Sequence, residues 1–217
     1  VTLSLERRKQ LIEFAATNNI PIVEDDPYGQ LCYEGECLPS VLELAAKYQN
    51  VIYMSTFSKI LAPGFRLAWV IGPREVIQRL VQAKQGADLH SSTLTQMIAY
   101  EVAKDGFLDE HIQLIRRVYH TRRNAMLEAM RANFPASVTW THPKGGLFLW
   151  VTLPQGVDAA ELLPEAVECK VAFVPGGPFH PDGTGKNTMR LNFSNATLEQ
   201  IEIGIARLGK LFASKFP

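Results

Sequence analysis

Short apolar runs alternate with helical segments along the first part of the chain, and this alternation restricts the possible fold more than any other feature. The runs at 20–23, 51–54 and 67–71 have the length and β-branched content of buried strands. Segments 3–18 and 73–85 instead have apolar residues at helical spacing. Strands that are apolar on both faces need cover on both, so the pattern predicts α/β layering around a largely parallel sheet.

The second half of the chain has a different pattern. Helical segments at 91–104 and 108–133 come first, and the latter is long and amphipathic. Strand-like and helical segments are interleaved after them. The strand-like segments are 138–141, 147–153, 171–174 and 189–193, and the helical ones are 158–169 and 198–212. This order predicts a compact α+β unit, so we expect two domains, 1–133 and 134–217.

Composition argues against several kinds of partner. Lysine plus arginine equals aspartate plus glutamate at 22 each, so net charge gives no attraction to nucleic acid or to a membrane surface. No apolar run approaches the ~18 residues needed to span a bilayer, and no secretory signal pattern opens the sequence. Cys32, Cys37 and Cys169 lack metal-ligand spacing and are expected to be reduced thiols of a cytoplasmic protein. The five histidines show no such spacing either, so we expect no metal site.

Acidic residues follow the first predicted strand. Asp25 and Asp26 lie at its carboxyl end, immediately before Pro27. Open α/β sheets bind their ligands at that edge. A carboxylate there could pair with a cationic ring nitrogen, coordinate Mg²⁺ or cap a turn, and the residues alone leave these three interpretations open.

A lysine follows the second predicted strand. Lys59 ends the run Ser-Thr-Phe-Ser-Lys, with Thr56 and Ser58 before it and Arg66 seven residues after it. Hydroxyls donate hydrogen bonds to phosphate, and arginine binds phosphate in bidentate fashion. Taken alone, a lysine after a strand is more often a surface residue. Pyridoxal-5′-phosphate (PLP) chemistry, however, needs a lysine for the Schiff base, a carboxylate on the ring nitrogen and a phosphate anchor, and all three are present here.

Ordered motifs carry a resemblance to a known family. They are Val-Glu-Asp-Asp-Pro-Tyr-Gly at 23–29, Ser-Thr-Phe-Ser-Lys at 55–59, Pro-Gly-Phe-Arg at 63–66 and Met-Arg-Leu-Asn-Phe-Ser at 189–194. With them the chain resembles the class I/II aminotransferases of PLP fold type I, and within these the branch of 2-aminoadipate and kynurenine aminotransferases. The resemblance covers essentially the whole chain, including Pro-Lys-Gly-Gly-Leu-Phe at 143–148 and Val-Pro-Gly-Gly-Pro-Phe at 174–179.

The resemblance implies a role for each matched residue. Asp25 would pair with the pyridinium nitrogen, and Tyr28 would donate a hydrogen bond to the 3′-oxygen of the ring. Lys59 would be the Schiff-base residue and the proton shuttle. The phosphate would be held by Thr56, Ser58 and Arg66. Arg190 would clamp the substrate α-carboxylate, whereas an arginine in an alternating strand, taken alone, more often covers an edge.

Other conspicuous residues are expected to be structural. The pairs Arg116–Arg117 and Arg122–Arg123 fall on the polar side of the long helical segment, where a solvated face is the default. Gly176–Gly177 predicts a turn, because no Gly-x-Gly-x-x-Gly spacing surrounds it.

The resemblance also implies the fold and the assembly. The fold is α/β, PLP fold type I (aspartate aminotransferase-like). Residues 1–133 would be the C-terminal portion of the large, mostly parallel-sheet domain with its long interdomain helix, and 134–217 the small C-terminal α+β domain. Enzymes of this family are nearly twice as long. We therefore expect a fragment that is inactive alone, exposes apolar sheet surface, associates with the missing N-terminal half and belongs to a homodimer.

The expected function is transfer of an amino group between an L-amino acid and a 2-oxo acid. One pair would be 2-oxoglutarate and glutamate; the other amino acid would be 2-aminoadipate, aromatic or branched-chain. Two alternatives stay open: the effector-sensing domain of a MocR-type transcription regulator, and a PLP-dependent lyase. The run Tyr33-Glu34-Gly35 after the Asp-Asp-Pro-Tyr-Gly motif favours the enzyme over the regulator.

Overall fold

The computed structural model describes residues 2–45 and 48–216, which form two compact units. One unit extends to Arg116 and the other begins at Arg117. The division falls inside α5 (Phe107–Asn133), whereas the sequence pattern placed a boundary at the end of that helix. The C-terminal part of α5 packs within the second unit: a Cβ on Gly209 would lie 2.4 Å from the carbonyl oxygen of Asn133.

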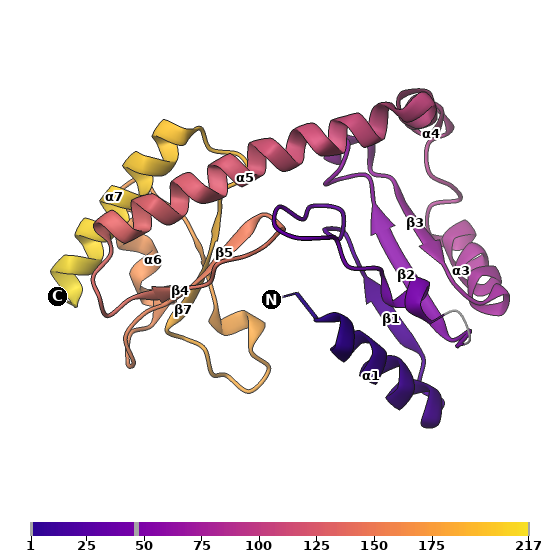
Figure 1. Cartoon of the computed structure of the whole chain (residues 1–217), viewed down its shortest axis with the longest axis horizontal. Coiled ribbons are helices and arrows are strands. Elements are labelled where there is room, and N and C mark those ends of the chain that lie inside the picture. The colour runs from indigo at the N-terminus through magenta and orange to yellow at the C-terminus, as the bar shows by residue number, and fades with distance from the viewer. Residues whose placement is uncertain (1, 46–47, 217) are drawn as a thin grey trace. The chain divides into compact units, whose positions relative to one another are not determined.

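The first unit is built on a three-stranded sheet (Figure 1). Its strands are β1 (Ile22–Asp25), β2 (Val51–Thr56) and β3 (Ala68–Ile71), in that order across the sheet. β1 runs parallel to β2, and β3 runs antiparallel to β2. β1 begins and ends two residues later than the sequence pattern indicated, because pairing starts with the N–H of Ile22, 2.9 Å from the carbonyl of Asn50. The strand therefore includes Glu24 and Asp25.

One face of this sheet is covered by α1 (Leu5–Thr17) and α2 (Val41–Leu44). α1 begins where the Ser4 side chain accepts the N–H of Arg7. The core on this face consists of Ala15, Ile22, Val41, Ala45 and Val51. On the other face Val23 and Val70 are 60% and 38% exposed. Among the described residues the sheet is thus covered on one side, in line with the expectation of exposed apolar sheet surface.

Helices complete the first unit. They are η1 (Pro63–Phe65), α3 (Arg74–Ala87), α4 (Thr93–Ala103), η2 (Lys104–Gly106) and the start of α5. The longer helices agree with the predicted segments to within about two residues, whereas α2 and the short 3₁₀ turns were not predicted. α4 and α5 are separated at Asp105 and Gly106, which both have positive φ.

The second unit contains a four-stranded antiparallel sheet. Its strands are β4 (Thr139–Trp140), β5 (Phe148–Thr152), β6 (Val174–Pro175) and β7 (Thr188–Asn192), in the order β4-β5-β7-β6. β6 is shorter than the predicted strand at 171–174. The reason is a left-handed residue, Lys170 (φ 63°), after which the N–H of Val171 returns to the carbonyl of Ala166, 2.9 Å away. These residues finish the preceding helix instead of starting a strand.

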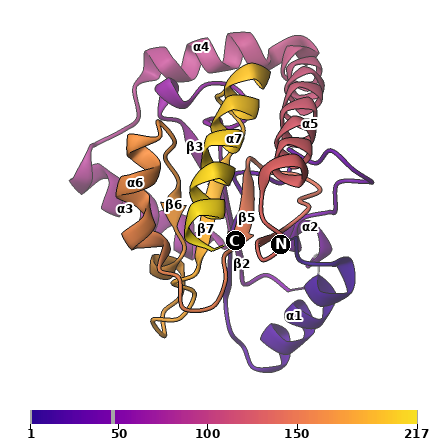
Figure 2. The ribbon, with the colours of Figure 1, turned by 90° about the vertical axis from the view of Figure 1, so that its left-hand side faces the viewer.

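Helices α6 (Ala159–Glu168) and α7 (Leu198–Lys215) lie side by side in this unit (Figure 2), and η3 is Gly177–Phe179. Alternation along the strands separates the two faces of the sheet. Leu149, Val151, Met189 and Leu191 are buried on one face, and on the opposite face Thr188 is buried as well. The four apolar residues form the core with helix residues such as Met130, Leu208 and Phe212, whereas Phe148, Trp150 and Arg190 point to the other face and are half-buried.

Three of the four paired arginines of α5 are not on a solvated face, so that prediction was wrong for them. Arg123 is only 1% exposed and donates to the carbonyl of Pro143, 2.6 Å away. Arg122 donates to the carbonyl of Ser194, and the half-buried Arg116 to that of Gln30. The guanidinium groups of these three arginines thus bind loop carbonyls.

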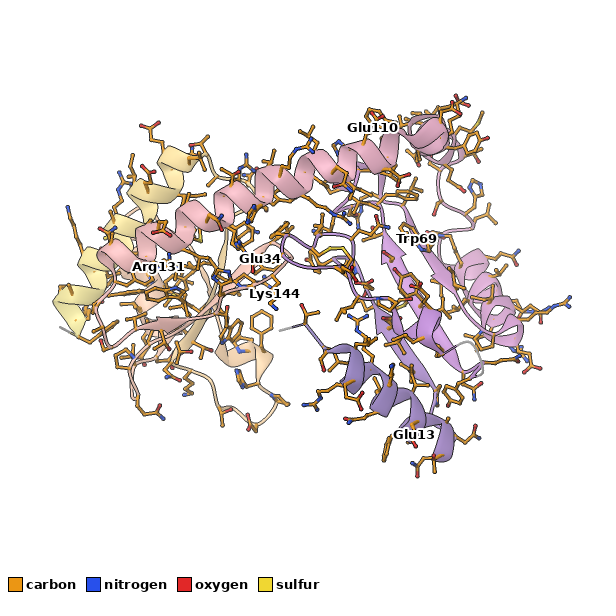
Figure 3. The ribbon with its side chains drawn as sticks, viewed as in Figure 1. Glu13, Glu34, Trp69, Glu110, Arg131 and Lys144 are labelled. Atoms are coloured by element: carbon orange, nitrogen blue, oxygen red, sulfur yellow. A yellow bond between two sulfur atoms is a disulfide. The ribbon has the colours of Figure 1, made fainter. Side chains whose placement is uncertain are left out.

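The expectation of three reduced thiols is also wrong. Cys32 and Cys37 form a disulfide, drawn in yellow in Figure 3, with Cα atoms 5.7 Å apart. Cys169 is free. The disulfide closes the loop that contains Glu34, which Figure 3 labels. Its Cα separation lies within the range that a disulfide requires.

Within residues 2–45 and 48–216, no helix has the length and apolar character that crossing a membrane requires. In the same ranges, no three or more histidine, cysteine, aspartate or glutamate side chains are grouped so that they could hold a metal ion.

Candidate active site

Most of the predicted site residues lie at or just beyond the carboxyl ends of β1 and β2. The two strands are parallel, so their carboxyl ends share one edge of the sheet. Asp25, the last residue of β1, is paired with Met54 and is exposed. Thr56 ends β2, and Lys59 follows three residues later. By strand alternation Asp25, Met54 and Thr56 belong to the same face of the sheet.

Glu24, next to Asp25, has a structural role that the sequence analysis missed. Its carboxylate accepts the N–H groups of Val41 at 2.8 Å and Leu42 at 3.1 Å, the first residues of α2. Arg8 lies 3.9 Å from the same carboxylate, whose side chain is 12% exposed. Alternation places Glu24 on the covered face with the buried Ile22, but it does not identify the helix that Glu24 caps. A carboxylate at a helix N-terminus is favoured by the helix dipole.

Asp26 is fixed in the turn after β1. Its N–H donates to the carbonyl of Met54 at 2.9 Å, and the hydroxyl of Ser55 donates to its carbonyl at 2.8 Å. Tyr53 donates to its carboxylate at 3.3 Å. Burial raises the pKa of Tyr53, and the nearby Asp26 carboxylate raises this pKa further. A side chain at Gly29 would collide with that carboxylate. Asp26 therefore serves the turn, which leaves Asp25 as the available carboxylate.

The loop that carries Lys59 is anchored on both sides. The hydroxyl of Thr56 donates to the carbonyl of Leu67 at 2.9 Å and accepts the N–H of Ser58 at 3.0 Å. Ile60 and Leu67 are buried. Trp69, labelled in Figure 3, has its ring 4.8 Å from that of Phe57 in the same loop. The loop is thus held from the ends of β2 and β3.

Lys59 itself is half-buried and retains its donors. Among the described residues, its ammonium group has no hydrogen-bond or ion-pair partner. The side chain of Ser58, one residue before it, lies 3.0 Å from the Thr56 hydroxyl. An amine without a competing carboxylate is free to react or to carry a proton.

Arg66 and Tyr28 belong to the turns that follow β2 and β1. Arg66 ends η1 in the left-handed conformation (φ 54°, ψ 39°), is exposed, and donates to the carbonyl of Pro63 at 3.2 Å. Non-glycine residues rarely adopt this conformation. Tyr28 is half-buried, and its carbonyl accepts the N–H of Leu31, which is fully buried. The buried leucine anchors the turn that presents Tyr28.

Arg190 lies in the second unit, on the open face of the antiparallel sheet. It is paired with Trp150 across β5 and with Val174 across β6. The guanidinium carbon lies 4.2 Å from the ring centre of Phe148 and 5.1 Å from that of Phe179. The strand alternation expected from the sequence is confirmed, because the neighbours of Arg190 along β7 are buried and Arg190 is not.

Sequence and structure comparisons identify relatives of the whole chain. Residues 1–208 match the model of the family "Aminotransferase class I and II". The chain is 46% identical over 208 residues to the 2-aminoadipate transaminase of Thermus thermophilus, covering 95% of this chain and 52% of that enzyme. It also superposes, with a TM-score of 0.94 and 45% identity, on LysN, the alpha-aminoadipate aminotransferase of Thermus thermophilus complexed with N-(5′-phosphopyridoxyl)-L-leucine. That match covers 97% of this chain and 55% of LysN.

A transcription regulator is among the relatives too. An uncharacterized HTH-type transcriptional regulator, YisV of Bacillus subtilis, is 35% identical over 203 residues, which are 94% of this chain and 41% of the regulator. The chain spans about half the length of the aminotransferases that it matches. The family model and the match to the 2-aminoadipate transaminase each cover nearly the whole chain. The chain therefore belongs to the class I and II aminotransferases, with the fold of the PLP fold type I enzymes.

Proposed function

We propose that this chain forms part of a PLP-dependent aminotransferase, which moves an amino group between an L-amino acid and a 2-oxo acid. One observation carries the proposal. An exposed carboxylate, Asp25, ends β1, and Lys59, an amine that has no partner among the described residues, follows the neighbouring parallel strand β2. PLP carries an aldehyde, a basic ring nitrogen and a phosphate, so both groups have an obvious counterpart on it.

The residues at this edge fit the cofactor in charge and in hydrogen-bonding capacity. Lys59 would bind the aldehyde carbon, and Asp25 would pair with the protonated ring nitrogen. Tyr28 would donate to the ring oxygen. Ser58 and the exposed Arg66 would bind the phosphate. Thr56 is proposed as the third phosphate-binding residue. Its hydroxyl donates to the Leu67 carbonyl and accepts the N–H of Ser58, so it also fixes the backbone of Ser58.

Bound PLP would withdraw electrons from the Cα of the amino acid, which makes the Cα proton acidic. Asp25 would keep the ring nitrogen protonated and so maintain that withdrawal. Lys59, a flexible amine at the loop, would take the proton from Cα of the bound amino acid and hold it for return. Arg190 would bind the α-carboxylate with two parallel N–H donors and so orient the Cα–H bond.

The substrates are proposed from the relatives. The Thermus thermophilus matches are named for aminoadipate, and LysN was crystallised with a leucine adduct. We therefore propose glutamate and 2-oxoglutarate as one pair, and aminoadipate, an aromatic or a branched-chain amino acid as the other partner. A homodimer and a cytoplasmic location complete the proposal, supported by the family to which the chain belongs.

The cofactor assignment is tested by mass spectrometry after borohydride reduction. The complete gene product that contains these residues is incubated with PLP, reduced and digested. One pyridoxyl phosphate group is expected on Lys59 in the natural protein and in the Lys9→Ala control, whose lysine is exposed on α1. No group should remain in Lys59→Ala. Equal labelling of Lys59→Ala would refute the assignment.

The reaction is tested by following amino-group transfer from glutamate to a 2-oxo acid. Transfer supports the aminotransferase. Release of acetate, pyruvate and ammonia from O-acetyl-L-serine, with water consumed and no 2-oxo acid acceptor present, would indicate a β-eliminating lyase instead. The similarity to a helix-turn-helix regulator supports a second candidate, an effector-binding domain. Binding of amino acid and PLP by the complete gene product without turnover, together with specific DNA binding, would favour that candidate.

A further inference from the structure

Arg190 is held in place by aromatic rings. Its guanidinium carbon lies over the rings of Phe148 and Phe179, at 4.2 and 5.1 Å from their centres. Phe148 lies diagonally across from Arg190 in the β5–β7 pair, where its partner is Asn192. Phe179 reaches the arginine from η3. The contacts thus come from two separate elements of the second unit.

The two rings contact the face of the guanidinium group and do not use its hydrogen-bond donors. Within the part of the chain that the structure describes, Arg190 has neither a hydrogen bond nor an ion pair. Arginine has five N–H donors in a rigid plane, and a carboxylate accepts two of them in parallel. An acidic neighbour would orient the side chain equally well, but it would neutralise the charge and compete with an incoming carboxylate. Aromatic rings orient the group by cation–π attraction and leave its charge and donors available.

A further aromatic residue supports this arrangement. Trp150, the cross-strand partner of Arg190, meets Phe179 edge-on, with ring centres 5.5 Å apart and planes at 80°. It also lies 6.3 Å from the ring of His180. Phe179 is 49% exposed, so packing against Trp150 is what restrains its ring.

We propose that Phe148 and Phe179 are positioning residues that hold the Arg190 guanidinium ready for a planar carboxylate, with Trp150 as the support of Phe179. This inference rests on the proposed role of Arg190 in binding the substrate α-carboxylate. It predicts that replacing either ring weakens recognition of that carboxylate specifically, without a general loss of the site.

The test compares two substrates that differ only at the α-carboxylate, L-glutamate and its α-carboxamide, L-isoglutamine. The ratio of their kcat/KM values reports recognition of the carboxylate, and a general loss of structure would lower both values together. The complete gene product is used in its PLP-loaded form, and the cofactor absorbance of each variant is recorded. The variants are Phe148→Leu, Phe179→Leu, Phe179→Tyr and Arg190→Leu, with Phe107→Leu as the control.

Phe148→Leu and Phe179→Leu are each expected to lower the preference for glutamate about 2- to 5-fold, the range for exposed cation–π contacts, mainly through KM. Phe179→Tyr, which keeps a ring, should retain the preference. Phe107 is 51% exposed, about as much as Phe179, but its ring stacks on His111 and not on Arg190. Phe107→Leu should therefore leave the preference for glutamate unchanged. Because Phe148 is half-buried, Phe179→Leu is the decisive variant if Phe148→Leu folds poorly.

Two outcomes overturn the inference in distinguishable ways. If Arg190→Leu loses the preference while Phe179→Leu keeps it, the rings do not position the arginine, and the proposed function stands. If Arg190→Leu keeps the preference, Arg190 does not bind the α-carboxylate, and both the inference and that part of the proposed function are wrong.

Discussion

Glu24 and Asp25 are neighbours on β1, and replacing each in turn should separate stability from cofactor binding. Glu24→Ala removes two hydrogen bonds to the first residues of α2 and a 3.9 Å contact with Arg8. Losing a helix cap destabilises a protein by about 1 kcal/mol, and a second bond to a charged acceptor adds about as much. The contact with Arg8 adds less than about 0.5 kcal/mol. We expect a loss of about 2 kcal/mol in the free energy of unfolding.

Urea unfolding, followed by far-ultraviolet circular dichroism, measures this loss. With a slope of about 2 kcal/mol per molar urea, the midpoint of Glu24→Ala should fall by about 1 M. Asp25→Ala is the matched control, because its side chain is exposed and its replacement should change stability by less than about 0.5 kcal/mol. Asp25→Ala should instead weaken PLP binding by the complete gene product. Equal midpoints for Glu24→Ala and the natural chain would refute the capping role.

Three further predictions concern the same chain. The pKa of Tyr53 in the folded state is raised above its unfolded value of 10.0. The contribution of Tyr53 to stability is therefore complete below pH 10 and is lost as the pH rises through the folded-state pKa. Tyr53→Phe should reduce this alkaline loss of stability, measured by urea unfolding at successive pH values. Arg123→Ala empties a buried site and removes the hydrogen bond to the Pro143 carbonyl, so it should destabilise the chain by about 3 kcal/mol in thermal unfolding. The control Arg117→Ala, at an exposed position of the same helix, should change stability by less than about 0.5 kcal/mol. Reduction of the Cys32–Cys37 disulfide should destabilise the chain by about 2 kcal/mol, the entropy of a loop this short, and Cys37→Ser should make dithiothreitol ineffective.

Periodicity was sufficient to predict most of the architecture. The helices and the strands of both sheets follow from apolar spacing, because burial of one face fixes the period of each element. The motifs that contain Asp25 and Lys59 were expected at the ends of strands, and the structure has Asp25 at the end of β1 and Lys59 three residues after β2. β6 was predicted too long, because a left-handed turn at Lys170 depends on how the helix before it ends and leaves no mark in hydrophobic spacing.

Contacts between segments distant in sequence could not be predicted. Glu24 caps a helix 17 residues further along, and Arg123 binds a carbonyl 20 residues away. Both are charged residues in polar runs, for which exposure is the default expectation. The Cys32–Cys37 pairing was missed for a related reason, since spacing alone does not show that a loop brings two Cα atoms to 5.7 Å.

Strand alternation gives neighbouring residues in this protein independent constraints on their evolution. On β1, Glu24 serves the covered face and Asp25 the open one. On β7, Leu191 is buried in the core while Arg190 faces the aromatic rings. A single substitution can therefore alter the open face without loosening the core, and a relative can acquire a new ligand preference while its fold is retained.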